Sequence, residues 1–337
     1  MVFWSTTGAA PSVADVLGLR GRHPRFLRFN VPSLSALGNS ARRADMRDVA
    51  DICAFWSAYY GGDDWVFDAT RDWVSKYLED PTVYVLVMTN ISVGLIATIV
   101  STPVTSGKTM MSHGAELDDV RCIEGLCIHP DYRSQGLAGE MIAAMDFFTA
   151  SIRPTVHLWS RELGTKPLFS TAVQVSTYAY IDSRKARRLY PVSMMQWDEF
   201  VRYWTNMSSL KKLLGTYILG SVPSNRRGDL IVWSCGERLA VISRTRRRTR
   251  DSRRSIYEVI WCNQFVSDGS YELFLESVAV EYDGLLFASS ASVGGAASRD
   301  WDPPWVVGRS GVHAWYIYNY IPPSFGSCEL HMVREEI

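Results

Sequence analysis

Several chemical signatures are missing from this 337-residue sequence. Its six cysteines form no CxxC pair, and the chain contains neither an HExxH nor a GxSxG motif. These absences argue against a structural zinc site, a zinc protease and a hydrolase with a nucleophile elbow. Scattered cysteines suit reduced, mostly buried thiols, so we expect a cytoplasmic protein with no bound metal.

Net charge and long apolar runs are missing as well. Lys plus Arg and Asp plus Glu balance at 35 each, which argues against a dedicated nucleic-acid-binding protein. The most apolar region, residues 83–100, is interrupted by Thr-Asn-Ile-Ser and is rich in β-branched residues. It therefore predicts two strands and a turn rather than a membrane span. The first residues show no basic stretch followed by an apolar one, so no signal peptide is expected.

The pattern of helical and strand-like segments occurs twice along the chain. Each occurrence runs helix, antiparallel strands, helix and strand, which predicts a mixed α/β protein with a boundary near 185–195. In the first half, residues 44–60 have helical apolar spacing, and Asp68 or Thr70 is expected to cap the helix that follows. The other expected elements of the first half are strands at 83–100 and 120–129, a helix at 134–148, a strand at 155–160, a helix at 165–172 and a strand at 174–181. Those of the second half are a helix at 195–214, strands at 229–244 and 254–265, a helix at 271–284 and a strand at 285–292.

The stretch IEGLCIHPDYRSQGLAGEM, residues 123–141, joins an apolar strand to a helix through a polar, glycine-containing turn. This geometry points backbone N–H groups and a helix N-terminus at an anion. Gly136 and Gly139 permit close approach of the backbone. The turn resembles the acetyl-CoA-binding turn of GNAT acyltransferases, whose pattern is R/Q-x-x-G-x-G/A.

Five other stretches extend the resemblance in order along the chain: VFWSTTGAAPSV at 2–13, YYGGDDWVF at 59–67, VGLIATI at 93–99, LWSRELGTKPLFSTA at 158–172 and WYIYNYIPPSFGSCELHMV at 315–333. Together with residues 123–138 they resemble the N-myristoyltransferase family (glycylpeptide N-tetradecanoyltransferase), of which this chain would be a short and divergent member. The resemblance implies an α/β fold of two GNAT-like halves, related by a pseudo-two-fold axis and fused into one saddle-shaped mixed sheet. It assigns acyl-CoA binding to residues 1–188. Residues 189–337 would supply the peptide groove and return the C-terminus to the active site.

The same resemblance implies an activity. The family transfers myristate from myristoyl-CoA to the α-amine of an N-terminal glycine, so the expected partners are peptides or proteins that begin with glycine, and the expected state is a monomer. Two alternatives stay open. One is a GNAT-type transferase of acetyl or another short acyl group. It is favoured by Gln135 and Gly136, which stand where the N-myristoyltransferase family has two basic residues. The other is a degenerate homologue that binds acyl-CoA or peptide without turnover.

Site residues follow by resemblance. The backbone amides of Gly125 and Leu126 would hold the oxyanion, Ser160 would stand for the family's active-site threonine, and the Ile337 carboxylate would act as base. Glu124 replaces an asparagine and would either hold the substrate ammonium or be an exposed strand residue. The expected acyl-CoA contacts are Phe3, Trp4, Leu126, Cys127, Ile128, Arg133, Ser134, Gln135, Gly136, Leu137 and Ala138. The expected peptide contacts are Tyr60, Asp63, Asp64, Phe67, Tyr180 and Tyr318.

Several of these residues also have simpler interpretations. Phe3 and Trp4 could form an apolar N-terminal anchor, and the tyrosines could be core residues. Residues 59–64 could be a helix end followed by the acids of the next helix.

The arginine run RTRRRTRDSRR, residues 244–254, lies between two predicted strands. It predicts a solvated hairpin loop that is dispensable for chemistry. The alternative is a transient contact with an acidic membrane or a ribosome. Because no aromatic residue interrupts the run, base stacking has no support and no specific nucleic-acid partner is expected.

Overall fold

A computed structural model describes residues 41–62, 64–103, 120–149, 156–162, 171–211, 228–263, 271–289 and 301–318, together with six short strands outside these ranges. Side chains are not described at the strand positions 156, 159–162, 171–177 and 308–318, at the end of the helix at 207–211, or in the six short strands. None of the helices in the described ranges is long and apolar enough to cross a membrane.

Within the described residues, the first half contributes three helices and seven strands of the large sheet. The helices are α3 (Val49–Tyr59), α4 (Arg71–Glu79) and α5 (Leu137–Thr149). The strands are β2 (Ala41–Arg43), β3 (Trp65–Phe67), β4 (Tyr84–Asn90), β5 (Gly94–Pro103), β8 (Val120–Ile128), β9 (Val156–Glu162) and β10 (Thr171–Asp182). Residues 83–100 thus form two strands and a turn, as predicted. Two 3₁₀ turns, η2 (Met46–Asp48) and η3 (Pro130–Tyr132), precede α3 and α5.

The second half contributes helices α6 (Trp197–Lys211) and α7 (Tyr271–Ala279). Its strands are β11 (Ser193–Met195), β13 (Leu230–Cys235), β14 (Arg238–Thr249), β15 (Ser255–Cys262), β16 (Gly284–Ser289) and β17 (Val306–Tyr318). The short strands β1 (Arg25–Phe26), β6 (Thr109–Met110), β7 (Glu116–Leu117), β12 (Tyr217–Leu219), β18 (Tyr320–Ile321) and β19 (Glu329–His331) pair among themselves.

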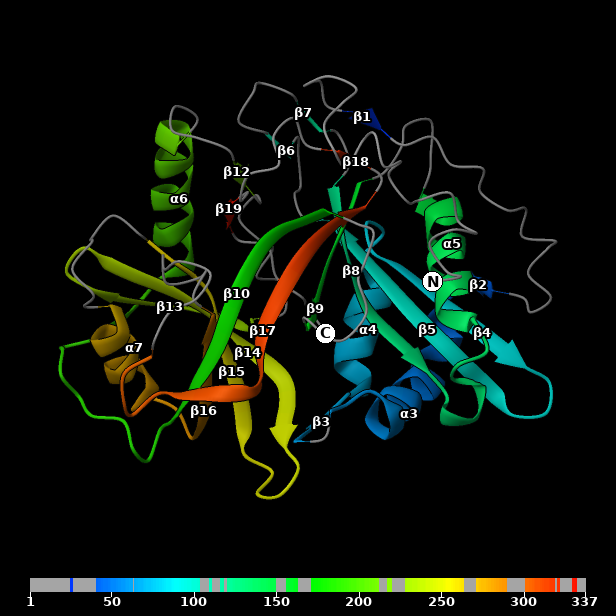
Figure 1. Cartoon of the computed structure of the whole chain (residues 1–337), viewed down its shortest axis with the longest axis horizontal. Coiled ribbons are helices and arrows are strands. Elements are labelled where there is room, and N and C mark those ends of the chain that lie inside the picture. Colours follow the sequence, from blue (N-terminus) through cyan, green and yellow to red (C-terminus); the bar gives the residue numbers. More distant parts are fainter. Residues whose placement is uncertain are drawn as a thin grey trace.

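One 13-stranded sheet runs through both halves (Figure 1). Its order is β11-β13-β14-β15-β16-β10-β17-β9-β8-β5-β4-β2, and β3 pairs with β14 off this path. Helices α3, α4 and α5 accompany the first half, at the right of Figure 1, and α6 and α7 accompany the second half at the left. The mixed sheet predicted from the sequence is therefore present.

The two halves repeat one topology. In each, three antiparallel strands lead into a strand, helix and parallel strand: β8, α5 and β9 in the first half, and β15, α7 and β16 in the second. This repetition confirms the predicted division into two halves of one topology. The boundary expected at residue 188 falls in the connection between β10 and β11, and it stays a prediction.

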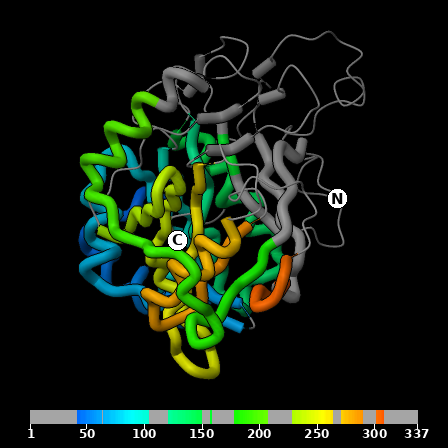
Figure 2. Tube along the Cα trace, turned by 90° about the vertical axis from the view of Figure 1, so that its left-hand side faces the viewer, coloured from blue at the N-terminus to red at the C-terminus, as the bar shows by residue number. Residues whose placement is uncertain are grey.

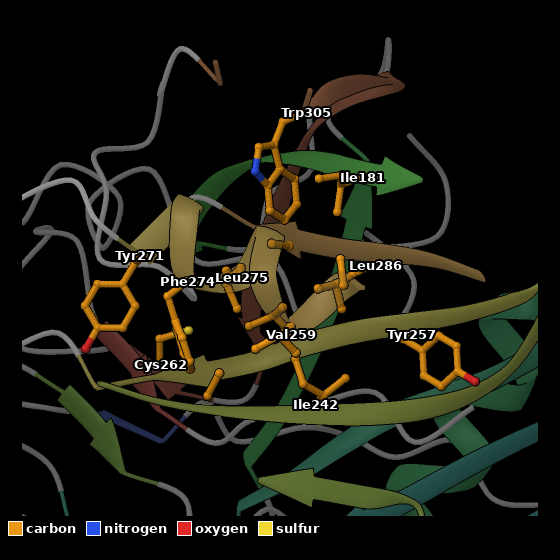
Figure 3. Close-up of a cluster of buried hydrophobic side chains, with 14 of the residues drawn as sticks. Ile181, Ile242, Tyr257, Val259, Cys262, Tyr271, Phe274, Leu275, Leu286 and Trp305 are labelled. Atoms are coloured by element: carbon orange, nitrogen blue, oxygen red, sulfur yellow. The ribbon is translucent and has the colours of Figure 1, made fainter. Parts of the chain in front are cut away.

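Alternating side chains of the strands separate the first-half core into two layers. On β4, Val85 and Val87 pack with α3 and α4, whereas Leu86 and Met88 pack with α5. In the second half, Phe274 and Leu275 of α7 belong to a cluster with buried sheet residues, which Figure 3 shows. The sheet is thus covered on both faces in the first half. This packing holds β8, the strand that carries the candidate site, in place.

Candidate functional site

A β-bulge lies on β8 at the residues expected to hold the oxyanion. The pairing of β5 with β8 shifts between Thr98↔Cys127 and Val100↔Glu124, so Gly125 and Leu126 together oppose one residue of β5. Gly125 has a φ of 58°, in the left-handed region that favours glycine. A bulge leaves its extra residue outside the ladder, which makes main-chain groups available to a ligand.

Two buried side chains hold this bulge. The Thr98 hydroxyl donates to the Gly125 carbonyl oxygen at 3.0 Å, and the Trp56 indole N–H donates to the Thr98 hydroxyl at 2.8 Å. Both side chains are fully buried. Sequence reasoning missed Thr98 and Trp56 as site residues, although a threonine inside an otherwise apolar strand was an available signal.

Glu124 precedes the bulge and is buried, with only 4% of its surface exposed. The Tyr77 hydroxyl of α4 lies 3.4 Å from the Glu124 carboxylate and donates to it. The alternative that Glu124 is an exposed strand residue is therefore wrong. A carboxylate thus lies next to the main-chain groups of the bulge, on the side of the sheet that α4 covers.

The parallel strands β8 and β9 separate just before the bulge. They pair only at Val120↔Val156, Arg121↔His157 and Cys122↔Leu158. Beyond that point β9 continues along β17 as far as Glu162, and Figure 1 shows β8 and β9 diverging. The bulge therefore lies where β9 no longer pairs with β8.

The turn after β8 has the predicted form. It passes through η3, Arg133 and two left-handed residues, Ser134 with φ 63° and Gly136 with φ 87°, before α5 begins at Leu137. Residues 133–136 are exposed. The first amides of a helix have no partner inside the helix, so the start of α5, next to this exposed turn, offers N–H donors and the positive end of the helix dipole to an anion.

Side chains of the turn stabilise its own shape. The Arg133 Nε donates to the Ile128 carbonyl at 3.1 Å, and the Gln135 Nε2 donates to the Asp131 carbonyl at 2.8 Å. Cys127 is buried, and burial raises the pKa of its thiol to about 12 although the Arg133 charge opposes the shift. Cys127 therefore stays a neutral thiol, and it can serve a ligand only as a wall or through its main chain.

The segment after α3 is anchored at both ends. Gly61 forms a bridge with Val66, the Gly62 amide donates to the Trp65 carbonyl at 3.2 Å, and β3 follows. Phe67 is 2% exposed and packs edge to face against Trp56 and Trp73. Phe67 is therefore an anchor of this segment, and contact with a peptide stays a prediction for Tyr60 and Asp64.

Of the remaining expected residues, Tyr180 is the one whose side chain the structure describes, and it lies away from the bulge. Tyr180 lies on β10, which β17 and β9 separate from β8, and its ring stacks on Phe287 with centroids 5.2 Å apart. This agrees with the alternative of a packing role for that tyrosine. Ser160 and Tyr318 lie on β9 and β17, but their side chains are outside the described set. Phe3, Trp4, Asp63 and Ile337 lie outside the described residues altogether.

The arginine run does not form a free loop. Arg244 to Thr249 belong to β14, the hairpin turn follows, and residues 247–249 pair with β3 of the first half. The prediction of a solvated loop is therefore wrong for the strand part of the run, because the backbone is taken up by sheet pairing. Among the described residues, no group of three His, Cys, Asp or Glu side chains could hold a metal ion.

Comparison with known proteins supports one fold. No family model matches the chain, and no curated protein sequence matches it. A structure of Saccharomyces cerevisiae N-myristoyltransferase with bound myristoyl-CoA is similar with a TM-score of 0.63 and 11% identity, over 95% of this chain and 87% of that one. A second structure of the yeast enzyme with bound myristoyl-CoA has a TM-score of 0.63 and 12% identity, over 94% of this chain and 92% of that one. The structure of a GCN5-related N-acetyltransferase from Anabaena variabilis has a TM-score of 0.50 and 12% identity, over 83% of this chain and 72% of that one.

These likenesses concern the fold, since the identities are low. They cover nearly the whole chain and both of its halves for the yeast enzyme. The chain therefore has the double GNAT-like fold of the N-myristoyltransferases, which confirms at the level of the fold the resemblance identified in the sequence.

Proposed function

We propose that this chain is an acyltransferase that moves an acyl group from a CoA thioester to an amine. The observation that carries the proposal is the bulge of β8, with its left-handed Gly125 fixed by the Thr98 hydroxyl. Attack of an amine on a thioester passes through a tetrahedral oxyanion. Preorganised N–H donors facing that oxygen contribute about 3 to 4 kcal/mol each. The Gly125 and Leu126 amides are the proposed donors.

The proposed acyl donor is myristoyl-CoA, the ligand bound in the similar yeast structures. The turn at residues 133–138, of which residues 133–136 are exposed, would hold the pyrophosphate through main-chain N–H groups and the start of α5. Gly136 suits this role because its φ of 87° keeps the turn in shape without a side chain beside the anion. Phe3 and Trp4 remain proposed contacts of the CoA.

The proposed acceptor is the α-amine of an N-terminal glycine. A side chain on the first residue would crowd an amine that must approach a carbonyl held against the bulge. The ammonium must also lose a proton before attack, and Glu124 is the buried carboxylate next to the bulge. We propose that Glu124 receives the ammonium at the site. The Ile337 carboxylate, the base expected from the resemblance, lies outside the described residues.

Acyl-chain length tests the donor. About a dozen buried methylenes at about 0.8 kcal/mol each would contribute up to roughly 10 kcal/mol, whereas an acetyl group contributes almost nothing. Affinity for CoA esters should therefore rise steeply with chain length. A flat series would instead favour a short-acyl GNAT transferase, the candidate that the Gln135–Gly136 turn supports.

Single-turnover transfer tests the reaction. Purified protein loaded with labelled myristoyl-CoA is mixed with a glycine-starting peptide and with the matched alanine-starting peptide. Transfer to the glycine peptide alone is expected. Equal transfer to both would refute the proposed specificity. Tight binding of the donor with no transfer to either peptide would leave a binding protein as the function.

A further inference from the structure

We propose that the arginine-bearing end of β14 is an intramolecular strap that positions the β8 bulge from the other half of the molecule. The inference rests on the proposed function, since it names the residues that keep the proposed oxyanion donors in place. It assigns the arginine run a role within the chain. A membrane or a ribosome is then not needed to explain this run.

The strap begins with main-chain pairing between the halves. Arg247, Arg248 and Thr249 of β14 pair antiparallel with Phe67, Val66 and Trp65 of β3. Figures 1 and 2 both show the β14–β15 hairpin projecting at the lower end of the molecule, and Figure 1 shows β3 beside it.

Two backbone hydrogen bonds extend this pairing beyond the strand. The Asp68 amide donates to the Arg246 carbonyl at 2.7 Å, and the Arg250 amide donates to the Asp64 carbonyl at 2.9 Å. The segment from Asp64 to Asp68 is therefore held along its full length by β14 and the residue after it.

Arginine side chains reinforce the pairing at three points. The Arg248 guanidinium forms an ion pair with Asp68 at 2.9 Å, and the Arg250 guanidinium donates to the Gly62 carbonyl at 3.0 Å. The Arg247 guanidinium lies 5.3 Å from the centre of the Trp65 ring. Glu258 of β15 lies 3.5 Å from the Arg247 guanidinium and fixes it from the second-half side.

From β3, Phe67 leads to the bulge along two routes. In the first, Phe67 packs on Trp56, whose indole N–H holds the Thr98 hydroxyl, which in turn holds the Gly125 carbonyl. The side chains of Phe67, Trp56 and Thr98 are all buried. Because a close-packed interior transmits displacements, a shift of β3 should move the side chains that hold the bulge.

The second route passes through α4. Phe67 packs on Trp73, Trp73 packs on Tyr77 with ring centroids 4.6 Å apart, and the Tyr77 hydroxyl donates to Glu124. The two routes end on adjacent residues, Glu124 and Gly125. The strap thus acts on both the proposed ammonium site and the bulge. Its arginines are positioning residues and do not touch the reacting atoms.

The test compares two matched double variants of the arginine run. Arg248→Ala with Arg250→Ala removes two contacts to the first half. Arg244→Ala with Arg253→Ala removes the same number of charges from side chains that show no hydrogen bond or ion pair with β3 in the described part of the chain. Hydrogen exchange is followed in peptides covering 60–68 and 120–128, with no acyl donor present. Single-turnover transfer and myristoyl-CoA affinity are measured on the same samples.

In the strap variant we expect faster exchange at 60–68 and at 120–128 and about tenfold slower transfer. The expected loss of rate is moderate because exposed ion pairs are individually weak and the backbone pairing of β3 with β14 remains. Affinity for myristoyl-CoA should stay within about twofold of the parent, because the turn at 133–138 is unchanged. The control variant should match the parent in all three measurements.

Unchanged exchange at 120–128 would overturn the strap, as would equal effects in the control variant. Uniformly faster exchange in every strand would also overturn it, because the contacts would then serve general stability. The single variant Arg248→Ala repeats the test if the double variant folds poorly. If the parent protein transfers no acyl group, the proposed function fails, and the exchange measurement still decides the strap.

Discussion

Thr98→Val should both destabilise the protein and slow acyl transfer. Valine has nearly the shape of threonine, so the change removes the hydroxyl and little else. The Gly125 carbonyl then loses its donor at 3.0 Å and the Trp56 indole N–H loses its acceptor at 2.8 Å. A buried polar group left without a partner costs about 1 to 3 kcal/mol, so the two together cost roughly 2 to 6 kcal/mol.

Thr98→Ser is the matched control. It keeps the hydroxyl and removes one buried methyl group, which costs about 1 kcal/mol. Urea unfolding of parent, valine and serine proteins gives the free energies of unfolding. The valine protein should be the least stable by at least about 1 kcal/mol relative to serine.

The kinetic effect separates the site from general stability. Loss of the Thr98 hydroxyl lets the bulge relax, so single-turnover transfer by the folded valine protein should fall about tenfold or more. Complete loss of one oxyanion donor, about 3 to 4 kcal/mol, sets the upper limit. If the valine and serine proteins have the same stability and the same transfer rate, the Thr98 hydroxyl does not hold the bulge and the reasoning fails.

Three further predictions concern the turn, a thiol and an acid-sensitive ion pair. Gly136→Ala and Gly136→Asp place a side chain on the same left-handed backbone, and in both the new Cβ enters open space. The two variants therefore differ mainly in charge, and aspartate should weaken myristoyl-CoA binding about tenfold more than alanine does. Equal affinities of the two variants in a binding titration would remove the turn from the pyrophosphate site. With its pKa raised to about 12 by burial, Cys127 should resist iodoacetamide at pH 8 until the protein unfolds, and mass spectrometry of labelled peptides would detect early modification that contradicts this. The hydrogen bonds from Arg184 hold the pKa of Asp182 well below its usual range, so the stabilisation is present above about pH 4 and is lost as the pH falls through the lowered value. Asp182→Asn should therefore be less stable at pH 7 and should lose less stability between pH 4 and pH 2 in urea titrations; parallel curves for parent and variant would count against it.

Local signals in the sequence predicted the parts of the site that are made by neighbouring residues. The turn at 133–138 is specified by its own glycine and its position between strand and helix, and the structure has it as predicted. The cap of α4 is Thr70, one of the two residues expected, and it accepts a hydrogen bond from the Trp73 amide. Each of these features depends on contacts within a few residues.

Contacts between distant segments could not be predicted in this way. The strand β3 is three residues long, and its partner on β14 lies about 180 positions later in the chain. Nothing in Trp65–Phe67 identifies that partner, and a run of arginines is most often a solvated surface. Glu124 is a similar case, because its burial depends on Tyr77 of α4, which approaches from another part of the sequence.

The order of strands in the sheet has a consequence for how this protein is made. The neighbours β16-β10-β17-β9 alternate in origin: β10 of the first half pairs with β16 and β17 of the second, and β17 of the second half pairs with β9 and β10 of the first. The halves are therefore interlocked. A ribosome must release β17, residues 306–318, before the first half can complete its sheet. Until then β9 keeps an unpaired edge, which is prone to association with other chains. The two GNAT-like units thus describe the repeated topology of the fold, whereas neither half can complete its part of the sheet without strands of the other.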